Sequence, residues 1–326
     1  METIFADLAQ ADQPGACVAV VQDGALAWSA AYGLADVRDR RACTTRTCFR
    51  LASVTKQLTA MAVLLLAEEG RLASDWPIGR LVDRLPDYAA EVTIHQLLCH
   101  TAGLVDYEDL LPAERTEQIL DAEVAQILPR TAEQGRYFAP GSAYRYSNTG
   151  YVLLALAAEQ ASGQPFAAVL RERIFAPLGM TTALAYVRGG PEVAERAYGH
   201  SWIGSAWQVT DQSVTSATLG DGGVYASVED LACWLAALDR GAIGQAATRQ
   251  AAWSAWASTP EGEGYGYGWK IATHRGEPLI RHSGTTMGFR SATIRLPQRG
   301  ISVAVLLNRS VADPTGLALQ VADRFA

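Results

Sequence analysis

The sequence places a serine three residues before a lysine, in Ser53-Val54-Thr55-Lys56, where an apolar period of three to four residues begins. If Ser53 opens a helix, Ser53 and Lys56 lie one turn apart on the same face. A helix N-terminus favours negative charge on the serine oxygen, and a lysine amine can accept the hydroxyl proton. The pair suits a serine nucleophile, but a helix cap followed by a surface lysine fits the spacing as well.

Lysine is scarce in this chain, so a serine three residues before a lysine is more informative here than it would be in a lysine-rich protein. Of its 27 basic residues only Lys56 and Lys270 are lysines, and only Asn148 and Asn308 are asparagines. A serine three residues before a lysine then arises by chance about one time in ten. Arginine could not replace Lys56 in proton exchange, because it stays protonated in proteins. Lys270 is interpreted as a solvated lysine at the end of a strand.

A second candidate is Tyr146-Ser147-Asn148, which precedes a predicted helix. Tyrosine is a poor base at its usual pKa of ~10, but an adjacent ammonium group lowers that value. Beside Lys56, Tyr146 could take the proton of Ser53 and return it to a leaving group. Asn148 could orient Lys56 or hold a substrate amide. The alternative is an aromatic anchor followed by an asparagine that caps a helix.

A third candidate is His282-Ser283-Gly284, at the end of a predicted strand. The hydroxyl of Ser283 can bind a carboxylate or a carbonyl group. Gly284 lets the backbone approach a ligand closely. The similar His274-Arg275-Gly276 is interpreted as a hairpin turn.

The elements that must position these residues change in type along the chain. Strands are predicted at 16–21 and 26–32, joined by an Asp23-Gly24 hairpin, and at 265–272, 279–282, 289–296 and 301–307. Helices are predicted at 53–69, 93–100, 113–132, 148–161, 165–175, 227–238 (capped by Ser227) and 314–325.

This order favours an α+β fold with one antiparallel sheet that is built from both chain ends and covered by the first and last helices. Residues 1–74 and 216–326 would form the sheet domain. Residues 75–215 would form an inserted, mainly helical domain, and the active site would lie at the interface.

The composition also excludes classes of function. A net charge of −7 without a basic run argues against nucleic acid as a partner. The longest apolar run, 60–67, is short of the ~20 residues that a membrane span needs. Five scattered cysteines fit buried thiols in a reducing compartment. No signal peptide is visible, so a cytoplasmic location is expected, or a periplasmic one if a leader was removed. No metal-ligand motif is found, and no cofactor is predicted.

Taken in order, the three motifs resemble those of the serine β-lactamase and penicillin-binding-protein superfamily. The resemblance is closest to the branch of class C β-lactamases, DD-peptidases, D-aminopeptidases and family VIII esterases. It covers nearly the whole chain, through segments 49–56, 97–104, 140–151, 222–231, 265–269 and 282–289.

The resemblance implies a β-lactamase/transpeptidase-like fold and a serine hydrolase that forms an acyl-enzyme. Ser53 would be the nucleophile, and Lys56 and Tyr146 would be its proton-transfer pair. The backbone N–H groups of Ser53 and Thr285 would form the oxyanion hole. The remaining residues implied to bind substrate or to support this hole are Asn148, His282, Ser283 and Gly284. His100, in the 97–104 segment, is interpreted as structural.

One departure from the family pattern bears on the substrate. His282 stands where most β-lactamases have lysine, and a histidine is only partly charged near neutral pH. The carboxylate of a β-lactam therefore has a weaker anchor. The predicted substrates are small molecules, with esters first and D-amino-acid peptides or amides second. The alternatives are β-lactams as the main substrates and a non-catalytic binding or sensor protein.

Overall fold

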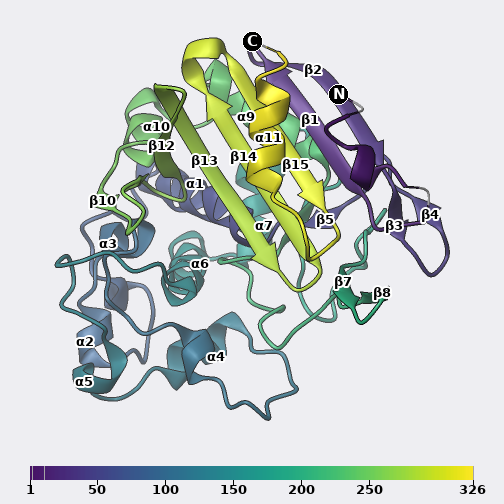
Figure 1. The fold of residues 1–326 in the computed structure, drawn as a ribbon. Helices are drawn as coiled ribbons and strands as arrows, with labels where there is room; N and C mark the ends of the chain where they lie inside the picture. Colours follow the sequence, from purple (N-terminus) through teal and green to yellow (C-terminus); the bar gives the residue numbers. More distant parts are fainter. Residues whose placement is uncertain (2, 11, 326) are drawn as a thin grey trace.

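The structure is a computed structural model that describes residues 1, 3–10 and 12–325. Its largest sheet is antiparallel, with the strand order β10-β11-β12-β13-β14-β15-β1-β2. The first two strands of the chain thus complete a sheet whose other strands come from residues 257–307 (Figure 1). The predicted sheet built from both chain ends is confirmed.

The strands of this sheet are Ala16–Gln22 (β1), Ala25–Tyr32 (β2), Ala257–Ser258 (β10), Gly264–Tyr265 (β11), Lys270–His274 (β12), Glu277–Thr286 (β13), Phe289–Leu296 (β14) and Ile301–Leu307 (β15). Smaller sheets are formed by Leu34–Asp36 (β3) with Arg41–Ala42 (β4), by Phe49–Arg50 (β5) with Val224–Ala226 (β9) and Leu184–Ala185 (β6), and by His200–Ile203 (β7) with Ala206–Val209 (β8). The α-helices are Thr55–Glu68 (α1), Asp87–Ala90 (α2), Ile94–Leu98 (α3), Asp121–Ile127 (α4), Ala132–Gly135 (α5), Asn148–Ser162 (α6), Phe166–Leu170 (α7), Ala176–Leu178 (α8), Val228–Arg240 (α9), Ala246–Ala252 (α10) and Pro314–Ala322 (α11).

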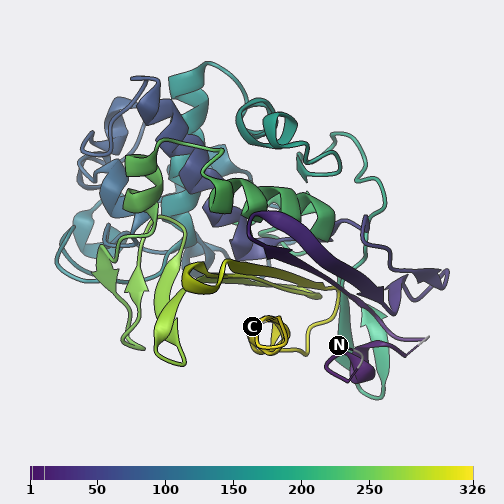
Figure 2. The same ribbon diagram turned by 90° about the horizontal axis from the view of Figure 1, so that it is seen from above.

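Helices cover both faces of the large sheet (Figure 2). Val18 and Val20 of β1 belong to the apolar cluster beneath α11, whereas Cys17 and Ala19 belong to the cluster shared with α1 and α9. Successive side chains of a strand point to opposite faces, so a strand buried on both faces reads as an unbroken apolar run. On the α9 side, Gln57 of α1 bonds to both β14 and α9. The last helix, α11, covers one face as predicted, whereas α9 rather than the first helix packs most closely on the other face.

Several predicted elements match the structure closely. Strands β14 and β15 have the predicted bounds, and Asp23-Gly24 forms the turn from β1 to β2. Helix α9 begins with the expected cap, because the Ser227 hydroxyl accepts the N–H of Asp230 at 3.1 Å. The Asp230 carboxylate accepts the N–H of Ser227 in return, also at 3.1 Å.

The predicted helix over 113–132 is wrong, because only α4 and the short α5 lie near it. Leu128 precedes Pro129 and takes an extended conformation with ψ 132°, which ends α4. Upstream, Ile119 donates its N–H to the carbonyl of Val214 at 2.8 Å instead of to a helical partner. The middle of the chain is also less helical than predicted, since β6, β7 and β8 lie within 184–209.

The predicted strand over 265–272 is interrupted for a reason that concerns the site. Between β11 and β12, Gly268 has φ +76°, and a Cβ there would lie 2.6 Å from the carbonyl oxygen of Lys56. Only glycine allows the turn to press on the first turn of α1 in this way. The interruption therefore helps to position Lys56.

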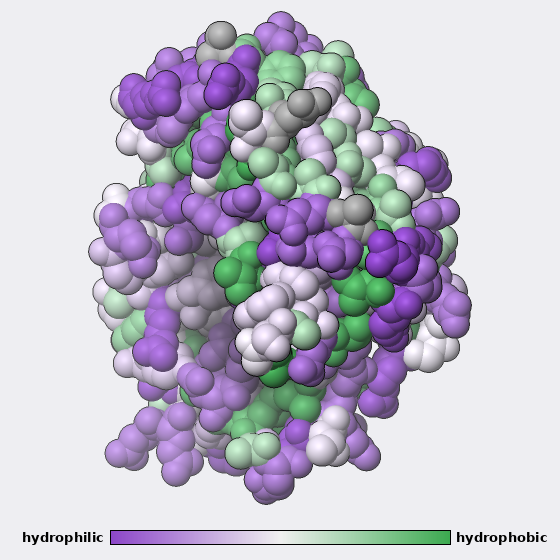
Figure 3. Space-filling model, turned by 45° about the vertical axis from the view of Figure 1, so that its right-hand side comes forward, coloured by the Kyte–Doolittle hydropathy of each residue, from purple (hydrophilic) through white to green (hydrophobic). Residues whose placement is uncertain are grey.

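Helices α2 to α6 lie to one side of the large sheet (Figure 1), and α6 packs against α1. The division into residues 1–74 with 216–326 and residues 75–215 stays a prediction. In the structure described, no helix is both long enough and apolar enough to cross a membrane. Figure 3 shows one face of the molecule, where hydrophilic residues predominate and apolar atoms lie in patches between them.

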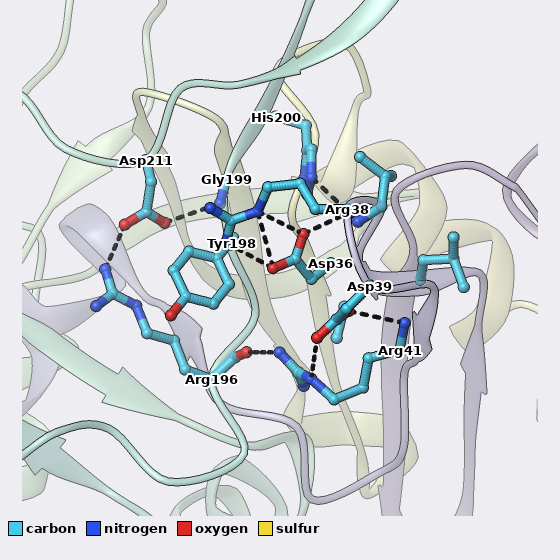
Figure 4. Close-up of polar contacts among 12 residues, drawn as sticks. Asp36, Arg38, Asp39, Arg41, Arg196, Tyr198, Gly199, His200 and Asp211 are labelled. Carbon is cyan, nitrogen blue, oxygen red and sulfur yellow. Dashed lines mark hydrogen bonds and ion pairs between the residues drawn. The ribbon is translucent and has the colours of Figure 1, made fainter.

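A polar network joins the β3–β4 segment to the stretch that leads into β7 (Figure 4). Asp36 accepts hydrogen bonds from the Arg38 side chain at 2.6 to 3.1 Å. Arg196 forms an ion pair with Asp211, whose other oxygen accepts the N–H of Gly199 at 2.8 Å. The Arg41 side chain donates to the carbonyl of Arg196 at 2.6 Å, and this bond holds together two segments that are remote in the sequence.

Asn308, one of the two asparagines, joins the same parts of the chain from within the core. Its Oδ1 accepts the N–H of Gly15 at 2.7 Å. Its Nδ2 donates to the carbonyls of Leu34, Ala35 and Tyr198 at 3.1, 3.0 and 2.9 Å. The side chain is fully buried, so no water can replace these bonds.

Asn308→Ala should lower the free energy of unfolding by about 2–4 kcal/mol, because each buried group left unpaired costs ~1–3 kcal/mol. Chemical denaturation measures the change. Gln298→Ala removes an exposed amide and should change the free energy by less than ~0.5 kcal/mol. A loss below 1 kcal/mol for Asn308→Ala would contradict the assigned role.

Candidate active site

Ser53 lies at the N-terminal end of α1, in a 3₁₀ turn, Ala52–Val54, that runs directly into the helix. Ala52 has φ +48°, in the left-handed region that residues with a side chain seldom adopt. Ala52 and Val54 are buried, whereas Ser53 is partly exposed. The turn therefore presents the Ser53 hydroxyl at the surface of a cavity, and such backbone strain is common at functional sites.

Lys56 is fully buried and donates three hydrogen bonds through its Nζ. The acceptors are Ser53 Oγ at 3.2 Å, Asn148 Oδ1 at 2.7 Å and the carbonyl oxygen of Asp221 at 2.8 Å. The amide and carbonyl oxygens can only accept, so they take two protons of the amine in either charge state. The third position, towards Ser53, carries a proton in the ammonium and a lone pair in the neutral amine.

Burial lowers the pKa of Lys56 to about 8, against the opposing effect of nearby carboxylates, Asp221 first. A substantial fraction of the neutral amine is therefore present near pH 8. Its lone pair then faces the Ser53 hydroxyl, which is the arrangement that a general base requires.

Tyr146 lies on the other side of the amine, with its ring centroid 4.9 Å from Lys56 Nζ. Its hydroxyl is buried and has no hydrogen-bond partner among the described residues. Burial raises the pKa of Tyr146 above its ordinary range, and the nearby Ser53 hydroxyl offsets only part of the rise. The expectation that the ammonium lowers this pKa is wrong, because the loss of solvent dominates. Tyr146 therefore keeps its proton in the resting site.

Asn148 connects Lys56 to a carboxylate. Its Oδ1 accepts from Lys56, and its Nδ2 donates to Glu108 Oε1 at 3.0 Å. Its backbone N–H donates to Asp106 Oδ2 at 2.6 Å, at the start of α6. The interpretation of Asn148 as a helix cap is wrong, since Ser147 holds that position. The structure supports the contact with Lys56 instead.

His282 is neutral in this site. Its Nδ1 lies 2.7 Å from the carbonyl oxygen of Ser283, and its Nε2 lies 3.0 Å from the hydroxyl of Tyr265. A carbonyl oxygen only accepts, so Nδ1 carries the proton and Nε2 accepts from Tyr265. Burial first, and then the charge of Lys56, lower the pKa of His282 to about 3. The expected weak anchor for a carboxylate therefore carries no charge at neutral pH.

Gly284 brings β13 close to the segment before Ser53. A Cβ at Gly284 would lie 2.2 Å from the carbonyl oxygen of Leu51 and 2.3 Å from Ser291 Oγ. Ser291 donates to the same carbonyl at 2.6 Å, which fixes the approach. Thr285 and Ser53 consequently line one cavity. The oxyanion hole formed by their backbone N–H groups stays a prediction.

His100 supports the Tyr146 segment from behind. Its Nδ1 accepts the N–H of Ser147 at 3.2 Å, and its ring centroid lies 4.3 Å from that of Tyr146. Burial lowers the pKa of His100 well below its ordinary value, so the neutral imidazole can accept this bond. These contacts agree with the structural interpretation of His100.

A cavity of about 840 Å³ opens in front of Ser53. The predicted residues Tyr146, Asn148, His282, Ser283 and Thr285 line it with Ser53. The other lining residues are Glu108, Tyr137, Phe138, Ala143, Tyr144, Arg145, Pro260, Glu261 and Lys270.

Lys270 lies at the end of a strand, as predicted, but its side chain is only partly exposed and faces two carboxylates. Its Nζ lies 3.6 Å from Glu263 and 3.9 Å from Glu261, and its side chain is 24% exposed. It begins β12 and lines the wall of the cavity beside Ser283. Lys270 and Arg145 are the basic residues that line this wall.

Glu108 is a site residue that the sequence reasoning missed. Glu108 is exposed, and it lines the cavity. Partial loss of solvent first, and then the charges of Asp106 and Asp221, raise its pKa to about 7. Within the described part of the chain, Glu108 forms no salt bridge, and its recorded side-chain bond is the one from Asn148. The available signal was the acidic pair Asp106 and Glu108 directly after the 97–104 segment. Within the same described residues, no cluster of His, Cys, Asp and Glu could hold a metal ion.

Comparison with known proteins identifies a matching family and several relatives of this chain. The family model "Beta-lactamase" matches residues 2–325. Penicillin-binding protein 4* of Bacillus subtilis is 29% identical over 95% of this chain and 71% of its own length. A D-aminopeptidase of Brucella canis is 30% identical over 90% of this chain, which spans only 56% of that protein.

A solved structure allows a comparison over nearly the full length of both chains. The D-amino acid amidase of Ochrobactrum anthropi, in complex with L-phenylalanine amide, superposes with a TM-score of 0.82 and 25% identity. The match covers 99% of this chain and 97% of the amidase. The predicted fold class is confirmed.

The rate at which a fluorophosphonate labels Ser53 should rise with pH through a midpoint near 8. Below that pH the amine of Lys56 is protonated and cannot accept the hydroxyl proton. Labelling rates between pH 5 and 10 measure the midpoint. His282→Asn should leave the midpoint in place, because His282 is neutral throughout this range. A rate independent of pH would contradict the assigned base.

Proposed function

The chain belongs to the beta-lactamase family and is a serine hydrolase of that superfamily. We propose that it forms an acyl-enzyme on Ser53 and that its substrates are amides, short peptides and esters of amino acids with a free α-ammonium group. D-amino acids are the proposed acyl donors. The observation that carries the substrate class is Glu108, a carboxyl group that lines the cavity beside the nucleophile and forms no salt bridge among the described residues.

Acylation follows from the hydrogen bonds around Lys56. The neutral amine accepts the proton of Ser53 while Asn148 and Asp221 hold its other two hydrogens. The serine oxygen then attacks the substrate carbonyl carbon, and the negative charge develops on the carbonyl oxygen. In the proposal the N–H groups of Ser53 and Thr285 stabilise this oxyanion, which is commonly worth several kcal/mol.

Expulsion of the leaving group needs a proton on its nitrogen or oxygen. The hydroxyl of Tyr146 is protonated and buried near Ser53, so it can donate while Lys56 replaces its proton. Tyr146 is therefore the proposed acid of the first step rather than the resting base. Lys56 and Tyr146 have different pKa values and both lie near the Ser53 hydroxyl. One can therefore accept the serine proton while the other donates a proton to the leaving group.

Glu108 favours substrates that carry an α-ammonium group over substrates that carry a carboxylate. An α-ammonium group beside the scissile carbonyl would supply the cation that Glu108 lacks and would keep it ionised. When it is ionised, Glu108 repels the carboxylate of a β-lactam, and neutral His282 offers no charge in compensation. Amino-acyl substrates therefore move ahead of simple esters, and β-lactams stay third. The names of the relatives, a D-aminopeptidase and a D-amino acid amidase, support the D configuration.

The catalytic roles can be separated by kinetics with D-phenylalanine amide. Ser53→Ala should abolish turnover, and Lys56→Ala and Tyr146→Phe should each reduce kcat by at least ~10²-fold, the usual scale for loss of a general base or acid. Thermal unfolding of each variant serves as the control for folding. A reduction of only a few-fold in either proton-transfer variant would contradict its assigned role.

Glu108→Gln should raise KM for D-phenylalanine amide by about threefold to fivefold, the upper end of the scale for an exposed ion pair. The glutamine keeps the size of the side chain and its contact with Asn148, so Lys56 stays in place. Hydrolysis of p-nitrophenyl acetate, which carries no ammonium group, is the matched control and should change less than twofold. Equal changes for both substrates would argue against recognition of the ammonium group.

A further inference from the structure

A second, smaller cavity adjoins the nucleophile. It has a volume of about 40 Å³, and four of its lining residues, Ser53, Glu108, Asn148 and Thr285, also line the large cavity. The other six are Arg50, Ala52, Thr215, Asp221, Gly222 and Thr286. All but Ala52 and Gly222 carry polar side chains, so the cavity suits water rather than an apolar group.

Two buried groups in the wall of this cavity have unmet hydrogen-bonding capacity. Arg50 is 3% exposed and Asp221 is 6% exposed. Arg50 Nη1 and Asp221 Oδ1 both lack a hydrogen-bond partner among the described residues. One is a donor and the other an acceptor, so water held between them can satisfy both. At ~10–15 Å³ for each molecule, the volume admits about three or four waters.

The other contacts of these residues hold them rigidly. Arg50 pairs with Tyr225 in the β5–β9 ladder, and its Nε donates to the carbonyl of Gly222 at 3.3 Å. The second carboxylate oxygen of Asp221 accepts from Tyr107 at 3.1 Å, and its carbonyl accepts from Lys56 at 2.8 Å. The small cavity is thus built on the segment that also orients the base.

We propose that this small cavity binds the water that hydrolyses the acyl-enzyme, with Arg50 as the residue that positions it. The inference rests on the proposed acyl-enzyme at Ser53. An acyl group on Ser53, with its substrate portion in the large cavity, would block that side of the ester to water. The small cavity also reaches Ser53 and Thr285, and Arg50, Gly222 and Thr286 form walls that the large cavity lacks.

The step balances without a further reactant. The water oxygen forms a bond to the acyl carbonyl carbon, and one water proton passes to the neutral amine of Lys56 or through Tyr146. The bond between the carbon and Ser53 Oγ then breaks, and the base returns that proton to the serine oxygen. The product is a carboxylic acid that keeps the second water proton until it ionises in solvent.

Two substitutions test the site by different routes. Arg50→Met removes the group that positions the water. Gly222→Ala retains Arg50 but adds a methyl group, whose ideal position lies 3.5 Å or more from the nearest atoms, those of Ala52. This distance is an ordinary van der Waals contact, so the methyl group fits and takes volume from the cavity that Gly222 lines.

Arg295→Met is the matched control for the loss of a buried arginine. Arg295 is 4% exposed and, like Arg50, has a buried Nη1 without a partner among the described residues. It is paired with Asp239 at 2.8 Å and lines neither the large nor the small cavity. A general loss of packing or stability therefore affects both arginine variants.

The experiment separates acylation from deacylation with a p-nitrophenyl ester of a D-amino acid. In Arg50→Met and Gly222→Ala, the burst of nitrophenol should keep its rate within threefold, while the steady-state rate falls at least tenfold. Acyl-enzyme should then accumulate in the intact mass. Arg295→Met should show neither effect.

Three outcomes would overturn the proposal. Deacylation at the wild-type rate in both variants would show that the cavity supplies no water. Equal losses in burst and steady state would assign Arg50 a purely structural role. Slow deacylation in Arg295→Met as well would point to general loosening. If the wild-type protein shows neither a burst nor labelling of Ser53, the proposed function fails first, which is a separate result.

Discussion

The placement of one ammonium group in the interior is the constraint on which the site depends. Burying a lysine without partners costs several kcal/mol, and here three oxygens from three distant parts of the chain surround it. They belong to the turn before α1, to the start of α6 and to the loop before β9. Helix α1 is itself held against β14 and α9 by Gln57. The site is thus where the large sheet and the helices beside it meet.

The electrostatics of the site follow from the same burial. The positive charge of Lys56 and the loss of solvent keep His282 neutral, and burial keeps Tyr146 protonated. The carboxylates of Asp106, Asp221 and Glu108 raise the pKa of Lys56 again, but less than burial lowers it. The amine is therefore poised near pH 8, where it can both give and take a proton. In our proposal, the carboxylates beside the nucleophile also favour a cationic substrate.

The sequence was sufficient to predict the sheet, because β1, β14 and β15 carry apolar runs bounded by clear turns. The sequence also predicted that Ser53, Lys56, Tyr146 and Asn148 share one site, because lysine and asparagine are rare in this chain and each occurs in one of two short motifs. It failed over 113–132, where pairing of Ile119 with a remote segment outweighed local helix preference. The sequence predicts a lowered pKa for Tyr146, whereas the pKa in the structure is raised, because burial is not visible in the sequence. Glu108 and Arg50 escaped notice because only the folded chain shows which charges lack partners.

The central claim is that Lys56 is a buried amine whose pKa lies near 8. The chain has only two lysines, so protein labelled with ¹³C at the lysine ε-carbon gives two resonances, and Lys270→Arg identifies the one from Lys56. Titration of that resonance by NMR measures the pKa directly. The account predicts a midpoint of about 8. A midpoint above 10 would mean that the amine stays charged throughout the working range, and Lys56 could not be the base that activates Ser53.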